Sequence, residues 1–214
     1  MELCERYYRR MIIMTKDVFR EFKWLNESSA KFREGRLVID APAKTDFFCN
    51  NGAISQSGIT PKTLYNAPFY YTEVTGDFVL SVKVSHVFRD TYDSATVMIM
   101  KDSNIWAKSC FEKTDFDTHA VVSVVTNHTS DDANGCTIDG NAVWLKAVRV
   151  NKSFSFHYSI DGSKYFMTRF FSLPVEETIR VGLVAQAPTG DGGERNFEHF
   201  TLEQRTVENI RFGE

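Results

Sequence analysis

Short segments of alternating apolar and polar residues recur along most of this chain, and they constrain its fold more than any other feature. The clearest segment is "GDFVLSVKVSHVF" at 76–88. Every second residue, from Phe78 through Leu80, Val82, Val84 and His86 to Phe88, lies on the mainly apolar side of this segment. Because successive side chains of a strand point to opposite faces, this segment predicts a half-buried antiparallel strand.

Comparable segments follow one another with hardly any helical periodicity between them. Strands are expected at 36–41, 94–100, 104–112, 120–126, 142–150, 153–159, 165–171, 178–186 and 196–202. Turn-forming Asn, Asp, Gly and Pro residues separate them. About eleven or twelve strands are too many for one open twisted sheet. The sequence therefore predicts one all-β domain over 15–214, a sandwich of two packed antiparallel sheets, with 1–14 as an N-terminal extension.

Composition and charge exclude several classes of protein. The chain is 43% hydrophobic and 25% charged, as globular proteins are. Its net charge of −3, without a long basic run, predicts no nucleic-acid partner. No apolar stretch approaches the ~20 residues that span a membrane. Nothing near the N-terminus resembles a secretion signal, so a cytoplasmic location is expected.

Cysteine spacing and known motifs point to no metal and no cofactor. The four cysteines are scattered, without a C-x-x-C pair or zinc-like spacing, which favours free thiols in a reducing compartment. There is no Walker loop, G-x-S-x-G elbow or H-E-x-x-H motif. The segment "SDDANG" at 130–135 is expected to be a turn rather than a calcium loop, because it lacks the spacing and the final Glu.

The segment 44–68 differs from the rest of the chain, because it is long and rich in Asn, Gly, Ser and Thr and contains two prolines. Long ordered loops are often functional. A crossing between the two sheets is an equally good interpretation.

Two predicted strands carry faces that a simple core does not explain. In 104–112, Trp106, Lys108 and Glu112 share one face, and Ile105, Ala107 and Phe111 share the other. In 142–150, Trp144 and Lys146 share a face, and Arg149 has the opposite parity unless a bulge shifts it. If these strands are neighbours of 120–126, which carries Ser123 and Thr126, their polar and aromatic residues gather in one region.

Two interpretations of such a region remain open. It can be a solvated surface, where exposed ion pairs contribute about 0–1 kcal/mol each. It can also be a concave binding face, where Trp106 and Trp144 are apolar platforms and Lys108, Glu112, Asp93 and Lys146 are polar contacts. That combination suits a sugar. A partly buried Lys108–Glu112 pair is then expected.

A catalytic role has weaker support. Glycosidases need two carboxyl groups about 5–5.5 Å or about 6.5–9.5 Å apart. Alternate residues of a strand lie about 7 Å apart on one face, so a catalytic strand would show two acids at that spacing. Glu112 instead has Cys110 and Thr114 at those positions. Asp93 is a conjectural partner from another strand.

Several segments together resemble one family. They are "TDFF" (45–48), "GDFVLSVKV" (76–84), "YDSATVMIMKDSNIWAKSCFE" (92–112), "SVVTNHTSDD" (123–132), "VWLKAVRV" (143–150), "YSIDGSKYFMTRFF" (158–171) and "VGLVAQAP" (181–188). Over roughly 20–204 the chain resembles the domain-of-unknown-function family that includes the fungal regulation-of-enolase protein. The resemblance implies a concanavalin A-like jelly roll of two antiparallel sheets, the fold of many lectins and glucanases.

The resemblance also implies a set of recurrent polar and aromatic positions. They are Tyr92, Asp93, Trp106, Lys108, Glu112, Ser123, Thr126, Asp131, Trp144, Lys146 and Arg149, with Asp46 and Gln186 at less distinctive positions. Because this fold hosts lectins, hydrolases and inert modules, the fold alone does not determine function.

We therefore expect a non-catalytic binding module that recognises a carbohydrate or another small polar metabolite on its concave sheet. One alternative is a protein-interaction regulator of a metabolic enzyme, with an exposed apolar patch built by Phe69, Tyr70 and Tyr71. Another is a glycoside hydrolase that uses Glu112 with Asp93.

Overall fold

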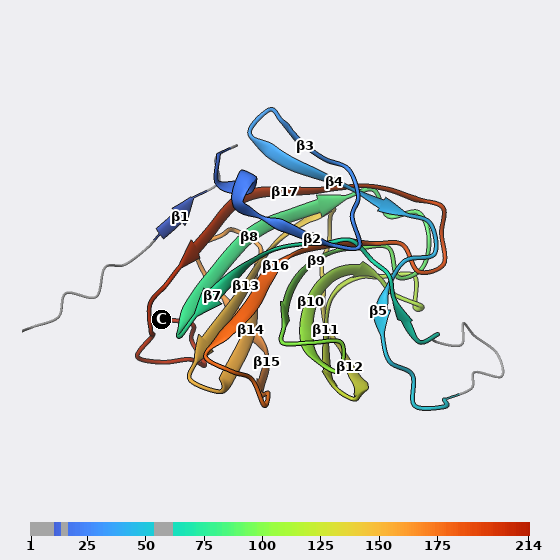
Figure 1. The fold of residues 1–214 in the computed structure, drawn as a ribbon. Coiled ribbons are helices and arrows are strands. Elements are labelled where there is room, and N and C mark those ends of the chain that lie inside the picture. Colours follow the sequence, from blue (N-terminus) through green and yellow to red (C-terminus); the bar gives the residue numbers. More distant parts are fainter. Residues whose placement is uncertain (1–10, 14–16, 54–61) are drawn as a thin grey trace, which may run out of the picture.

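A computed structural model describes residues 11–13, 17–53 and 62–214 of the chain. These residues form two large antiparallel β-sheets that lie face to face (Figure 1). The predicted all-β jelly-roll sandwich is therefore confirmed. Among the described residues, no helix has the length and apolar character needed to cross a membrane.

The first sheet consists of β15 (Phe166–Ser172), β14 (Ser153–Ser159), β13 (Ala142–Val150), β8 (Phe78–His86), β17 (Gly192–Glu203), β4 (Arg36–Pro42) and β3 (Ala30–Arg33), in that order, and β1 (Met11–Ile13) also pairs with β17. The second sheet consists of β12 (Thr129–Thr137), β11 (His119–Asn127), β10 (Ile105–Lys113), β9 (Ser94–Met100), β16 (Thr178–Gln186), β7 (Phe69–Thr75) and β2 (Lys23–Leu25). A short 3-10 helix, η1 (Val18–Glu21), precedes β2.

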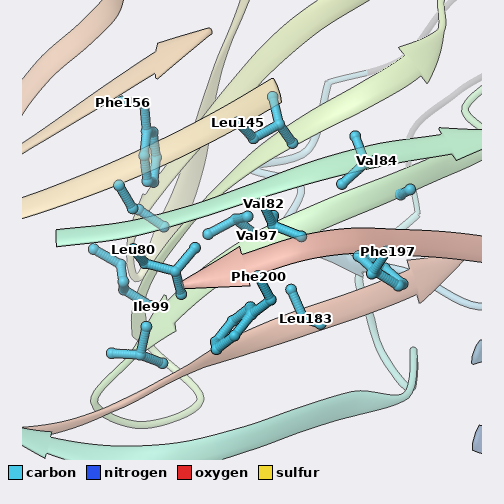
Figure 2. Close-up of a cluster of buried hydrophobic side chains, with 14 of the residues drawn as sticks. Leu80, Val82, Val84, Val97, Ile99, Leu145, Phe156, Leu183, Phe197 and Phe200 are labelled. Atoms are coloured by element: carbon cyan, nitrogen blue, oxygen red, sulfur yellow. The ribbon is translucent and has the colours of Figure 1, made fainter. Parts of the chain in front are cut away.

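The space between the sheets is filled by the apolar side chains on one face of each strand, as the alternation predicts. Leu80, Val82 and Val84 of β8 meet Val97 and Ile99 of β9 across the sandwich (Figure 2). All five are essentially inaccessible to water. Burial of large apolar side chains contributes about 1.5–3 kcal/mol for each residue, so this layer is the main source of stability.

The predicted strands match observed strands closely, but the structure adds others. The segment 130–135, predicted as a turn, lies within β12 and pairs antiparallel with β11, so that prediction is wrong. Its Asp, Asn and Gly residues have low strand propensity, but the pairing of a long hairpin overrides that preference. The division of the chain at residue 14 stays a prediction, although Met11–Ile13 already pairs with β17.

The described parts of the segment 44–68 lie over the outer face of the second sheet. They contain a two-stranded ladder of β5 (Phe47–Phe48) and β6 (Leu64–Tyr65), and Figure 1 shows β5 beside β10, β11 and β12. We call residues 44–53 and 62–67 the covering segment. It creates a second apolar cluster outside the main core, which includes Phe47, Trp106 and Met98.

Candidate functional site

The mixed face of 104–112 is the outer face of β10, directed away from the main core. Ile105, Ala107 and Phe111 belong to the core between the sheets, whereas Trp106 belongs to the cluster beneath the covering segment. On this outer face Lys108 lies between Met98 of β9 and Val124 of β11. Glu112 lies between two small residues, Ser94 and Ala120.

The covering segment closes one end of this face. The ring of Phe47 lies edge-on to Trp106 with their centroids 6.0 Å apart. Cys49 and Ser130 of β12 are joined by two hydrogen bonds of 2.9 Å. Trp106 is 0% exposed as a result, and its predicted role as a ligand platform is wrong. A tryptophan on an outer sheet face is buried here because a distant segment lies over it.

The other end of the face remains open as a pocket of about 400 Å³. Its floor is formed by side chains from β10, β11 and β16, namely Lys108, Glu112, Val122, Val124 and Gln186. The covering segment contributes Lys44, Asp46, Phe48, Lys62 and Leu64. The remaining walls are Tyr92, Asp115, Phe116, Asp132, Asn134, Pro188 and Thr189. A pocket of this size accommodates a small ligand.

Lys108 is held by two protein partners. Its ammonium group lies 2.8 Å from Oδ1 of Asp46 and donates a 3.0 Å hydrogen bond to Oε1 of Gln186. The expected ion pair with Glu112 is therefore not the one that forms. Burial would lower the pKa of Lys108, but the neighbouring Asp46 carboxylate outweighs it and the pKa is raised.

Glu112 is only 8% exposed, yet it lines the pocket. Among the described residues, no side chain or backbone group forms a hydrogen bond or an ion pair with its carboxyl group. Burial raises the pKa of Glu112 to about 8, because Lys108 offsets only part of the loss of hydration and Asp46, Asp132 and Asp115 add to it. A carboxyl group of this kind is neutral near pH 7 and can donate a hydrogen bond.

Two aromatic residues flank the mouth of the pocket. Phe116 is 74% exposed in the turn between β10 and β11. Tyr92 has a φ of 70°, and its backbone N–H donates a 2.6 Å hydrogen bond to the carbonyl of Lys113. Burial, together with Asp115 and Glu112, raises the pKa of Tyr92 to about 12, so its hydroxyl stays neutral. Phe116 thus offers the pocket an apolar ring, and Tyr92 offers it a neutral hydroxyl group.

Asp93 does not reach the pocket. Its carboxylate is buried and lies 3.1 Å from Nη2 of Arg195, which reaches it from β17 in the opposite sheet. Arg195 also donates hydrogen bonds to the carbonyls of Ser94 and Gln186. Asp93 therefore links the two sheets, and its expected partnership with Glu112 is wrong.

Three further predicted residues on β11 and β12 lie near the site but not in it. Ser123 is buried on the core side, opposite Ser109. Thr126 is buried on the outer face, where its hydroxyl lies 2.8 Å from that of Ser130. Asp131 forms a 3.0 Å ion pair with Arg169 of β15 and so joins the edges of the two sheets.

The predicted residues of 142–150 belong to the other sheet, because β13 pairs with β8 and β14. Trp144 stacks on His199 with a centroid distance of 5.2 Å, and Lys146 lies 3.6 Å from the ring centroid of Tyr165. Arg149 donates hydrogen bonds of 2.8 Å to the carbonyls of Glu176 and Glu177. The expected gathering of the two tryptophans is therefore wrong.

Of the predicted residues, the pocket thus unites Asp46, Tyr92, Lys108, Glu112 and Gln186. The sequence pattern did not indicate the pocket residues that lie on turns and on β12, above all Phe116, Asp115, Asp132 and Asn134. One signal could have found Phe116, since a large aromatic residue inside the polar turn "TDFDT" has no core to fill.

The polar side chains that line the pocket can donate and accept hydrogen bonds. Burial raises the pKa of the Cys110 thiol to about 12, which keeps it from acting as a thiolate nucleophile. Within the described part of the chain, no group of three or more His, Cys, Asp or Glu side chains could hold a metal ion.

Several solved structures share this fold. A functionally unknown protein from Saccharomyces cerevisiae is 24% identical with a TM-score of 0.78, over 88% of this chain and 99% of that chain. The GH43 BlXynB protein from Bacillus licheniformis is 16% identical with a TM-score of 0.59, over 79% of this chain but only 33% of that chain. Carbohydrate binding module CBM66 from Bacillus subtilis is 12% identical with a TM-score of 0.53, over 85% of this chain and 95% of that chain.

Comparison with curated protein sequences gives no match. A family model described as "Protein of unknown function (DUF1349)" matches residues 24–205, which is most of the chain. The predicted membership of a domain-of-unknown-function family is thus confirmed, whereas the link to the fungal regulation-of-enolase protein stays a prediction. The chain belongs to the DUF1349 family.

Proposed function

We propose that this protein is a non-catalytic binding module whose pocket takes a carbohydrate or a sugar-like metabolite. The observation that carries the proposal is the Glu112 carboxyl group, which has no partner among the described residues and lies on the floor of a pocket of about 400 Å³. A buried polar group without a partner is costly, so a ligand that supplies its hydrogen bond gains affinity there.

The surroundings of Glu112 suit a sugar in particular. Phe116 offers an exposed ring for the C–H face of a sugar, and Asp132 and Asn134 of β12 offer hydrogen-bonding groups. The fold supports the same reading, because one structure that shares it is named a carbohydrate binding module. Cys49, Cys110 and Cys136 are free thiols, which supports a location in a reducing compartment such as the cytoplasm.

The geometry favours binding over hydrolysis. Asp93 is held by Arg195 away from the pocket, and Asp46 is already paired with Lys108. Asp132 lies two strands and four register positions from Glu112. At ordinary strand spacings their backbones are about 16 Å apart, which is wide for the two-carboxylate mechanism.

The test is a glycan-array screen followed by calorimetry on the strongest candidates. Phe116→Ala is expected to weaken binding at least about fivefold, the loss of roughly one aromatic contact. Phe212→Ala is the matched control, because Phe212 is also exposed but lies outside the pocket. The proposal fails if no sugar binds, or if Phe116→Ala and Phe212→Ala behave alike.

A second candidate, a protein-interaction module, is favoured by a different surface. Phe166 and Phe170 are each more than two-fifths exposed on β15, an edge strand of the first sheet. The prediction of an exposed apolar patch at Phe69, Tyr70 and Tyr71 is wrong. Phe69 is fully buried, and the two tyrosines pack against apolar clusters. Loss of a stoichiometric partner from Phe170→Ser, but not from Phe116→Ala, would favour this candidate.

A further inference from the structure

We infer that Glu112 meets its ligand as a neutral carboxylic acid, so that the pocket selects uncharged sugars and polyols over sugar acids and amino sugars. The inference rests on the proposed function and adds the chemical class of the ligand. It begins with the position of Glu112, more than nine-tenths buried on the pocket floor and without a hydrogen-bond or ion-pair partner among the described residues.

Among the described residues, no cation forms an ion pair with Glu112. The lysine on the same face of β10 is Lys108, whose ammonium group is held by Asp46 at 2.8 Å and Gln186 at 3.0 Å. The cross-strand neighbours, Ser94 and Ala120, carry no charge. Cys110, on the same face of β10, stays a neutral thiol because burial raises its pKa to about 12. Protonation is therefore the simplest way to neutralise the carboxyl group of Glu112.

The remaining titratable groups that face the pocket balance one another. The covering segment supplies Lys44, Lys62 and Asp46, β10 supplies Lys108, the β10–β11 turn supplies Asp115, and β12 supplies Asp132. Three lysines thus face three aspartates, and Tyr92 stays neutral. When Glu112 is protonated, the charges of the lining residues sum to zero. A charged ligand therefore meets no excess of opposite charge in the pocket.

The electrostatics of Glu112 agree with this geometry, because burial, reinforced by Asp46, Asp132 and Asp115, raises its pKa to about 8. A neutral carboxyl group has one O–H donor and one carbonyl acceptor. A sugar hydroxyl also donates and accepts, so the two form a complementary pair without burying an uncompensated charge.

The experiment measures binding by calorimetry at pH 6, 7 and 9 for D-glucose, D-glucuronate, D-glucosamine and the strongest neutral glycan from the screen. It compares the natural protein with Glu112→Gln, whose amide copies the donor and acceptor of the neutral acid. We expect the neutral probe to bind equally at pH 6 and 7 and about tenfold more weakly at pH 9, where about one Glu112 in ten stays protonated. Glu112→Gln is expected to keep the affinity and to lose this pH dependence.

A ¹³C NMR titration of the glutamate carboxyl groups reads the same residue without a ligand, with Glu112→Gln identifying the signal by its loss. If the titration midpoint of Glu112 lies at a pH well above that of exposed glutamates, the inference is supported. A midpoint at the ordinary pKa of glutamate overturns it. Tighter binding of glucosamine or glucuronate than of the neutral probes overturns it as well. If no probe binds, the proposed function fails, whereas the titration still decides the state of Glu112.

Discussion

The ammonium group of Lys108 and the carboxylate of Asp46 form a 2.8 Å ion pair that ties the middle of β10 to the covering segment. The two side chains are only 3% and 14% exposed, so the pair lies largely out of water. It joins the covering segment to the floor of the pocket, and the ammonium group of Lys108 pairs directly with Asp46 rather than with Glu112.

Breaking this pair is expected to destabilise the protein strongly. Asp46→Ala leaves the buried Lys108 ammonium uncompensated, which costs about 3–5 kcal/mol of the free energy of unfolding. Replacing both partners, as in Asp46→Ala with Lys108→Met, is expected to restore much of that loss, because no buried charge remains. Urea denaturation of the two single variants and the double variant measures the coupling. Independent, additive effects would contradict the prediction.

The stacking of the covering segment on Trp106 gives a second prediction. Phe47 is fully buried, so Phe47→Ala removes a large core side chain and is expected to cost about 3–5 kcal/mol in unfolding free energy. It should also open Trp106 to water and shift tryptophan fluorescence to longer wavelength, a change that disappears in a Trp106→Phe background.

Phe116→Ala is the matched control for Phe47→Ala, since Phe116 is 74% exposed and is expected to alter stability by less than about 0.5 kcal/mol. Equal destabilisation by the two substitutions would show that the covering segment does not depend on Phe47.

The ion pair between Asp93 and Arg195 gives a third prediction, because it joins the two sheets while both side chains are at most 2% exposed. Asp93→Ala is expected to cost about 3–5 kcal/mol in thermal or chemical unfolding. The neighbouring pair of Arg33 and Glu194 is more than half exposed, so Glu194→Ala should change stability by only about 0–1 kcal/mol. A large effect of Glu194→Ala with a small effect of Asp93→Ala would refute this assignment.

Glu112 gives a prediction about stability and pH. Its pKa is raised from 4.5 in the unfolded chain to about 8 in the folded protein. Between these values the folded state holds a proton that the unfolded state has lost, so stability falls as pH rises from about 4.5 to about 8. Burial makes the size of this loss on the order of a few kcal/mol.

Glu112→Gln removes that proton and is expected to be more stable than the natural protein at pH 8 but not at pH 4.5. Urea denaturation curves at pH values between these limits measure the difference for the two proteins. A difference that does not change with pH would show that Glu112 titrates normally.

The sequence by itself determined the all-β class, the two-sheet sandwich and most strands, because a period of two residues is a local property of an extended chain. It also separated the two faces of β10, placing Ile105, Ala107 and Phe111 on the core side. It could not reveal that β12 is a strand, since the polar residues of 130–135 have weak strand propensity and are held by pairing with β11.

Only the tertiary structure decided which residues form the pocket. Trp106 is buried because Phe47 lies over it. Lys108 forms an ion pair with Asp46 and donates a hydrogen bond to Gln186, which lie 62 and 78 residues away in the chain. Trp144 has a similar local pattern but lies in the opposite sheet, because strand neighbours are chosen by topology rather than by alternation. Alternation tells which side of a strand a residue faces, whereas the contacts between distant segments decide whether that side meets core, solvent or ligand.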